Sequence, residues 1–123
     1  MIHLDTSFLI RALIPGTPED AALRTWVTAG ETIAMSAVGW AELLCGPLTS
    51  ADLDLARLII DRCVDFNRDH AVAAARLFND SGRRRGSFVD CMIAATAISD
   101  AASIATSNKA DFERFAGAGL TIA

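Results

Sequence analysis

The chain has 123 residues, of which 52% are hydrophobic, and its formal net charge is -4 at pH 7. This length and apolar content fit one packed core, so we expect residues 1–123 to form a single domain. The negative charge argues against a protein that coats nucleic acid through its overall charge, but it leaves room for a local basic patch.

Short apolar runs alternate with longer helical patterns along the chain. The strand-sized runs lie at 2–4, 32–36, 63–66, 103–106 and 120–123, and most lack alternation of apolar and polar residues, as expected for strands covered on both faces. Helical patterns lie at 6–14, 19–29, 37–45, 50–62, 68–80, after Ser87, and at 109–116. Strands that alternate with helices predict an α/β fold with a mainly parallel sheet flanked by helices.

Cysteine usage and the N-terminal segment indicate the compartment. Cys45, Cys63 and Cys91 are odd in number, far apart and set among apolar residues, which argues against a disulfide framework or a zinc site. We expect them to be small core side chains in a reducing cytoplasm. The first apolar run carries Asp5 and Arg11 without a basic leader, so we do not expect a signal peptide. No apolar stretch approaches the roughly 20 residues of a membrane span.

Four acidic residues are placed near the ends of the predicted strands. In open parallel sheets, functional sites form beyond the carboxyl ends of the strands. Asp5 directly follows the first strand, Glu42 lies in the helix after the second, and Asp111 lies just beyond the fourth. Asp90 opens the helix that leads into the fourth strand, so its position at this edge depends on the topology. Three of the four acids can therefore share one edge.

Each acid also has an ordinary structural interpretation. Asp5 is suited to cap the helix that follows it. Ser87 and Asp90 resemble a capping box, in which the carboxylate also complements the helix dipole. Glu42 has the position of an early-turn surface residue, although its apolar neighbours disfavour a solvated face. Asp111 has the position of a cap or a surface acid. Their shared context, more than any single residue, favours a common site.

Clustered carboxylates need a cation or a proton. Two carboxylates about 5 Å apart at an effective dielectric constant near 20 repel by roughly 3 kcal/mol. Oxygen ligands without thiolate or imidazole favour Mg²⁺ or Mn²⁺ over zinc. Such ions polarise phosphoryl oxygens and activate water, which is the chemistry of phosphodiester hydrolysis. His3 and His70 are expected to be structural, and no serine stands in a nucleophile elbow.

Four segments together resemble the PIN domains, and in particular the VapC toxins of bacterial and archaeal toxin–antitoxin pairs. They are "MIHLDTSFLI", "SAVGWAELLCG", "RRRGSFVDCMIAATA" and "IATSNKADFERF". The resemblance implies a parallel sheet of order 3-2-1-4-5 flanked by helices, an acidic cluster that holds Mg²⁺ or Mn²⁺, and endoribonuclease activity. It places the metal ligands on Asp5, Glu42 and Asp90, with the hydroxyls of Thr6 and Ser7 supporting Asp5.

The fourth acid departs from the family pattern. Many members carry an acid two residues after the threonine that corresponds to Thr106, and here that position is Asn108. Either Asp111 acts as the fourth acid and contacts the metal through water, or the site has three acids only. A site with three acids is less suited to a second metal ion. Asp111 is therefore the fourth candidate for both the catalytic and the metal-binding set.

The resemblance also implies partners: an RNA substrate, a small VapB-like antitoxin and a second copy of the chain in a homodimer. We expect the antitoxin to pack in an apolar groove near Trp40 and Leu43 and to pair an arginine with the acids. The run from Arg83 to Arg85 is either an RNA-backbone contact or a solvated loop. The sequence does not identify the RNA, since it contains no base-recognition motif.

Two other functions fit part of this pattern. A phospho-receiver domain also uses acids and a metal at this edge, but its threonine and lysine are well separated, whereas Thr106 and Lys109 are three residues apart. A catalytically inactive PIN-like domain that serves as a binding or scaffold module remains open. Metal-dependent cleavage of RNA distinguishes that module from an enzyme.

Overall fold

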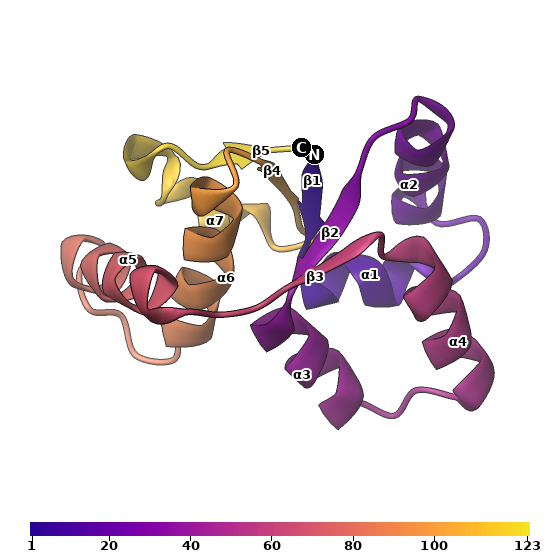
Figure 1. Ribbon diagram of the computed structural model, residues 1–123, viewed down its shortest axis with the longest axis horizontal. Helices are drawn as coiled ribbons and strands as arrows, with labels where there is room; N and C mark the ends of the chain where they lie inside the picture. The colour runs from indigo at the N-terminus through magenta and orange to yellow at the C-terminus, as the bar shows by residue number, and fades with distance from the viewer.

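A computed structural model describes all residues from 1 to 123 and places them around one five-stranded sheet (Figure 1). The strands are β1 (Ile2–Leu4), β2 (Ile33–Ser36), β3 (Arg62–Val64), β4 (Ser103–Ala105) and β5 (Thr121–Ile122). All neighbouring pairs are parallel, and the strand order is β3-β2-β1-β4-β5. The predicted α/β fold with sheet order 3-2-1-4-5 is confirmed.

Seven α-helices flank the sheet. They are α1 (Thr6–Ala12), α2 (Pro18–Thr28), α3 (Ala37–Cys45), α4 (Ser50–Ile59), α5 (Arg68–Asp80), α6 (Phe88–Ser99) and α7 (Lys109–Glu113), and a 3₁₀ turn follows at Ala116–Ala118. The largest differences from the sequence-based boundaries are three residues: α7 ends at Glu113 instead of residue 116, and α4 ends at Ile59 instead of Arg62. The chain leaves this helix because Asp61 exchanges hydrogen bonds with Ile33 of β2, through its backbone N–H and its carboxylate.

The sheet separates two hydrophobic clusters. One packs β1 and β2 against α1–α4, with Leu9 and Leu43 among its fully buried residues. The other packs β4 against α5, α6 and α7, with Ile104 and Phe112 at its centre. Figure 1 shows the two groups of helices on either side of the strands. Strands β1 and β2 are buried along their whole length, as expected, whereas the edge strand β3 is largely exposed.

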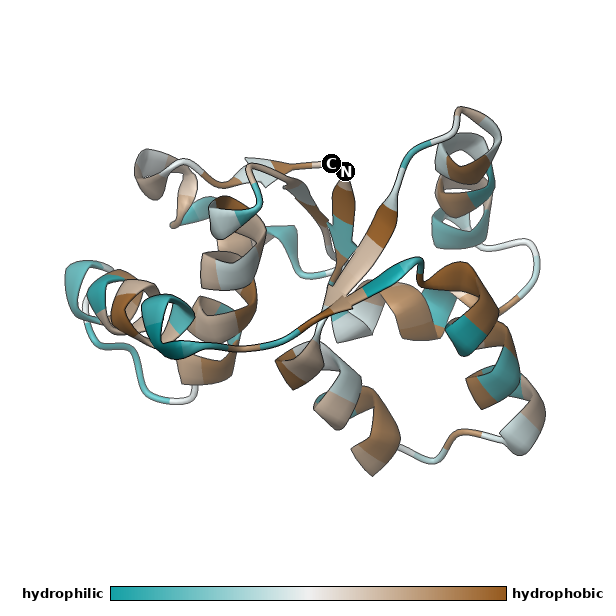
Figure 2. Cartoon of the chain, in the orientation of Figure 1, coloured by the Kyte–Doolittle hydropathy of each residue, from teal (hydrophilic) through white to brown (hydrophobic).

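Helix α6 is the apolar centre of its layer. It is buried from Ile93 to Ala97 and is covered from outside by α5, whose hydrophilic residues appear as teal stripes in Figure 2. The predicted capping box at its start is wrong. Ser87 has helical backbone angles, and its Oγ donates to the carbonyl of Arg84 at 2.6 Å. The Ser87 hydroxyl therefore bonds to a carbonyl of the preceding loop and does not cap α6.

The cysteines are only partly in the core. Cys91 is buried in α6, as predicted, but Cys45 and Cys63 are exposed. The prediction was wrong for these two because Cys45 is the last residue of α3 and Cys63 lies on the edge strand β3. Apolar sequence neighbours do not bury a residue at a helix end or at a sheet edge.

Both histidines have structural roles. The ring of His3 is fully buried, and its Nε2 shares a hydrogen bond of 2.8 Å with Oδ2 of Asp100 at the end of α6. His70 forms a capping box with Asn67 at the start of α5. None of the helices combines the length and the apolar character needed to cross a membrane.

Candidate active site

Asp5 is the most firmly held of the four acids. It follows β1 and caps α1, and its Oδ1 accepts a hydrogen bond from the backbone N–H of Thr6 at 2.9 Å. Its Oδ2 accepts from Oγ of Ser7 at 2.7 Å and from Oγ1 of Thr106 at 2.8 Å. The residue is 5% exposed. Its predicted capping role is confirmed, and the same contacts hold its carboxylate in one orientation.

The loop after β4 orients the two hydroxyls. The backbone N–H of Asn108 donates to Oγ1 of Thr106 at 3.0 Å, and that of Ser107 donates to Oγ of Ser7 at 3.2 Å. Each hydroxyl therefore accepts from the backbone and has its single hydrogen free for Asp5. Sequence reasoning missed the contact from Thr106 to Asp5. Pairing of β1 with β4 produces it, because the residues that follow the two strands become neighbours.

Glu42 reaches the same edge from α3. Its Oε1 lies 3.1 Å from Oγ1 of Thr6, the residue whose backbone N–H binds Asp5. Thr6 thus links the two carboxylates, although its hydroxyl hydrogen is shared with the carbonyl of Gly39 at 3.0 Å. Burial is the largest cause that raises the pKa of Glu42, and the negative charge of Asp5 raises it further.

The tertiary structure brings Asp90 to this edge as well. Helix α6 has 12 residues, a length of about 18 Å, and it leads into β4 from the opposite direction, so its first turn lies at the carboxyl edge of the sheet. Burial raises the pKa of Asp90 to about 6, and the negative charges of Asp5, Asp111 and Glu42 act in the same direction. The charges of the other three predicted acids therefore all reach Asp90.

A polar cleft of about 100 Å³ adjoins Asp90 and Asp111. Its other lining residues are Arg84, Arg85, Gly86, Ser87 and Arg114. Nη2 of Arg114 lies 3.9 Å from Oδ2 of Asp90, and Nη1 of Arg84 lies 3.7 Å from Oδ1 of Asp111. Nε and Nη2 of Arg114 are buried without a hydrogen-bond acceptor. Sequence reasoning missed Arg114, since a lone arginine after a short helix carries no signal.

Arg83 differs from its two neighbours. Its guanidinium lies 5.3 Å from the ring centroid of Phe78 and donates a hydrogen bond to the side chain of Asn79. The three arginines therefore lie in two places: Arg84 and Arg85 line the cleft, whereas the side chain of Arg83 packs against α5.

The four carboxylates suit a hard divalent cation by their chemistry. All their donor atoms are oxygen, and the charges of three acids act on Asp90, with Arg114 in opposition. The spacing is open, since no three His, Cys, Asp or Glu side chains stand close enough to hold one ion. Mg²⁺ fits such a set, because it usually keeps several waters and takes only one or two carboxylates.

Several solved structures share this fold along nearly the whole chain. VapBC2 from Rickettsia felis, bound to a DNA fragment from its promoter, matches with a TM-score of 0.79 and 23% identity, over 100% of this chain and 98% of that one. DNA-bound VapBC from Salmonella typhimurium matches with a TM-score of 0.74 and 21% identity, over 99% and 96%.

A further similar structure is the Mycobacterium tuberculosis toxin VapC20, described as cleaving the sarcin–ricin loop. It matches with a TM-score of 0.69 and 19% identity, over 100% of this chain and 98% of that one. A comparison with curated protein sequences finds no match.

The sequence also matches a protein-family description, that of the PIN domain, over residues 2–118. This range contains four of the five strands and all four acids of the carboxyl edge. Because the match covers nearly the whole chain, the protein belongs to the PIN domain family.

Proposed function

We propose that this PIN domain is a metal-dependent endoribonuclease and acts as the VapC-like toxin of a toxin–antitoxin pair. The observation that carries the proposal is that the charges of Asp5, Glu42 and Asp111 act together on Asp90, with Asp5 held by two hydroxyls. The toxin–antitoxin complexes and the RNA-cleaving toxin among similar structures support it. Incubation of the purified protein with RNA in Mg²⁺, Mn²⁺ or EDTA tests it.

Within this proposal, one or two of Asp5, Glu42 and Asp90 would bind Mg²⁺ or Mn²⁺ directly, and the remaining acids, Asp111 included, would act through metal-bound water. The bound ion supplies polarisation of a phosphoryl oxygen and activation of water. The hydroxyls of Ser7 and Thr106 both donate to Oδ2 of Asp5 and so hold this carboxylate in one orientation. The backbone N–H of Asn108 orients Thr106, and the Asn108 side chain makes no capping hydrogen bond to α7.

We also propose that the cleft arginines bind RNA phosphates. Replacing Arg84 and Arg85 together with Ala is expected to weaken RNA binding, because each lost phosphate contact removes the release of counterions. For single strands, the slope of log K against log salt should flatten by about 0.7 per contact. Fluorescence anisotropy with labelled RNA in EDTA measures this slope. Arg83→Ala is the matched control, since its side chain lies against α5; equal slopes in all three proteins would contradict the phosphate contacts.

An antitoxin needs an apolar docking site, and the predicted one near Trp40 and Leu43 requires correction. Leu43 is fully buried in the core and is unavailable to a partner. An apolar groove of about 470 Å³ lies elsewhere, between α2 and α4, and its lining includes Leu13, Pro15, Leu23, Val27, Leu55 and Ile59. We propose that an amphipathic segment of a small VapB-like antitoxin packs there and that its arginine pairs with the acids.

Expression of the chain alone is expected to arrest bacterial growth, and co-expression with the product of an adjacent small gene should restore it. The Leu55→Glu variant should remain toxic but escape neutralisation, because a charge in the groove opposes apolar packing. Ile10→Glu, at a residue 43% exposed and outside that groove, is the control and should still be neutralised. Neutralisation of both variants to the same degree would contradict this docking site.

We further propose that the protein is a homodimer. The helices that suggested this, α4 and α5, expose Leu58 and Val72, and the neighbouring helices α3 and α6 expose Leu44 and Phe88. Homodimer interfaces are more apolar than the rest of a protein surface, so exposed side chains of this kind are candidates for one. Light scattering at micromolar protein measures the mass directly.

A further inference from the structure

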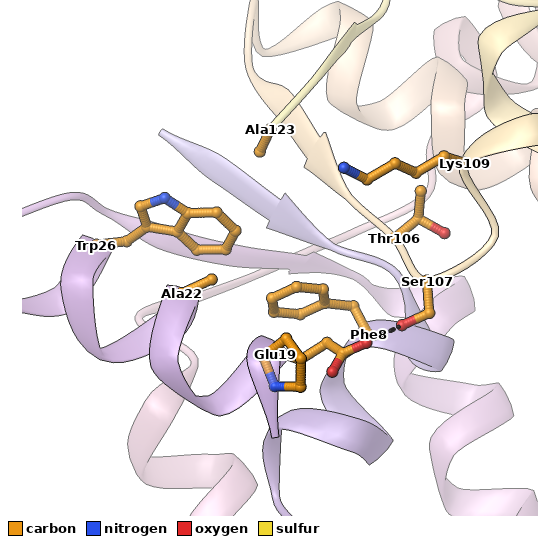
Figure 3. Close-up of a pocket in the computed structure, with 9 residues that line it drawn as sticks. Phe8, Glu19, Ala22, Trp26, Thr106, Ser107, Lys109 and Ala123 are labelled. Atoms are coloured by element: carbon orange, nitrogen blue, oxygen red, sulfur yellow. Dashed lines mark hydrogen bonds between the residues drawn. The ribbon is translucent and has the colours of Figure 1, made fainter. Parts of the chain in front are cut away.

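A second cavity, of about 330 Å³, lies beside the acidic edge (Figure 3). Its volume falls in the range of about 300–1,000 Å³ that small-molecule sites occupy. The residues that shape it come from α1, α2, the loop after β4, the start of α7 and Ala123 after β5. Neither the proposed metal ligands nor the cleft arginines line it.

One wall of this cavity is aromatic. The rings of Phe8 and Trp26 are stacked, with centroids 5.4 Å apart and planes inclined by 25°. Phe8 is buried, whereas Trp26 is only half-buried and leaves part of its indole in the cavity. Aromatic side chains that present a free surface are the platforms on which nucleic-acid bases stack.

The floor carries an acceptor without a donor. Oε1 of Glu19 accepts from Nε of Arg11 at 2.8 Å and from Oγ of Ser107 at 3.1 Å, while Oε2 is buried without any partner. The hydrogen bond from Arg11 lowers the pKa of Glu19, so the carboxylate is ionised and only accepts. Oε2 has almost no accessible surface, so an N–H group of a ligand would reach and satisfy it after a small rotation of the carboxylate. Figure 3 shows the ammonium of Lys109 reaching across from the other side.

The cavity and the acidic edge share a wall, formed by Thr106 and Ser107. Oγ1 of Thr106 binds Asp5, and the backbone N–H of Ser107 binds Ser7 at the edge. On the other side, the Ser107 hydroxyl donates to Glu19 within the cavity. A nucleotide whose phosphate lies at Asp5 therefore has this cavity as the adjacent place for its base.

We propose that this cavity binds the base of the nucleotide next to the scissile phosphate, and that Glu19 selects a base with an exocyclic amino group. The inference rests on the proposed ribonuclease function and adds to it the class of nucleotide at the cleavage site. A carboxylate accepts a hydrogen bond from the amino group of cytosine. Uracil carries a carbonyl oxygen at that position, which would face Oε2 as a second acceptor.

Mononucleotide binding tests the cavity without catalysis. In the Trp40→Phe background, Trp26 is the only tryptophan, so its fluorescence reports on the cavity. With EDTA present, CMP is expected to change this fluorescence at about tenfold lower concentration than UMP. Trp26→Phe, which keeps Trp40 instead, is the control and should not respond. Absence of any Trp26 response, or equal responses to CMP and UMP, would overturn the proposal.

A Glu19→Gln variant tests the selection itself. With Oε1 still bound by Arg11, the amide nitrogen replaces Oε2 and turns the acceptor into a donor. The preference is therefore expected to reverse, so that UMP binds more tightly than CMP. Mapped cleavage sites in a random RNA pool should shift in the same direction.

The two proposals fail separately. If the unaltered protein and the Glu19→Gln variant cleave RNA with the same base preference, the base-site proposal is overturned and the ribonuclease proposal is supported. If neither cleaves RNA but Trp26 still distinguishes CMP from UMP, the ribonuclease is overturned and the base site is supported by the titration alone.

Discussion

The Asp5→Asn variant is expected to lose RNA cleavage by at least about 100-fold while it remains folded. Loss of even an outer-shell partner of a metal ligand costs about 10- to 100-fold, and Asp5 is proposed as a ligand itself. Asn caps helices as well as Asp does, so the bond from Thr6 to the side-chain oxygen can persist. The variant loses the hydrogen bonds from the Ser7 and Thr106 hydroxyls to Oδ2, which lowers its stability. Removal of the Asp5 charge relieves repulsion among the acids and offsets part of this loss.

Gel assays with RNA and Mg²⁺ measure this loss, and circular dichroism checks the fold. Asp54→Asn is the matched control, because it removes the same charge from a side chain 73% exposed on α4, away from the acidic edge. Full activity of Asp5→Asn would contradict the assignment. If the unaltered protein binds RNA but fails to cleave it in Mg²⁺ or Mn²⁺, the inactive binding or scaffold module is the better interpretation.

The Asp90→Asn variant is expected to be more stable than the unaltered protein at about pH 7.5 in EDTA. The pKa of Asp90 is raised to about 6 in the folded state, against an ordinary value of 3.8, so the folded protein binds this proton more tightly than the unfolded chain. The stability due to this proton is fully present below about pH 4 and is lost as the pH rises through 6.

At about pH 7.5 the Asp90 carboxylate is charged in both states, and only in the folded state is this charge partly buried and repelled by the other acids. Each pKa unit corresponds to about 1.4 kcal/mol. The Asp90 side chain is 31% exposed, and Arg114 opposes the repulsion, so we discount the free energy that corresponds to the pKa shift for solvent screening. We expect Asp90→Asn to gain about 1 kcal/mol in the free energy of unfolding.

Urea unfolding at several pH values measures the difference in the free energy of unfolding between Asp90→Asn and the unaltered protein. This difference should shrink towards zero as the pH falls to about 4. Asp54→Asn should show no comparable gain in stability. Added Mg²⁺ should stabilise the unaltered protein by mass action and leave Asp90→Asn nearly unchanged. Lower stability of Asp90→Asn at about pH 7.5 in EDTA would mean that interaction with the helix dipole and Arg114 outweighs the cost of burial and repulsion.

Patterns local in the sequence determined the fold class and most elements. Helix α3 follows from a helical apolar run that stops at Gly46-Pro47, and its bounds match the prediction. Short apolar runs between such helices predicted the five parallel strands. The 3-2-1-4-5 strand order came only with the resemblance to PIN domains, because periodicity does not state which strands pair.

The sequence by itself placed Asp5, Glu42 and Asp111 near strand ends, because each follows a strand within one segment of chain. Only the tertiary structure decided what surrounds them. Pairing of β1 with β4 put Thr106 against Asp5, 101 positions away in the chain, and the direction of α6 carried Asp90 to the same edge. Arg114 and the cavity at Glu19 also depend on contacts between distant segments. Side-chain chemistry and periodicity are local properties, whereas the neighbours that shift a pKa or orient a carboxylate are set by how the elements pack.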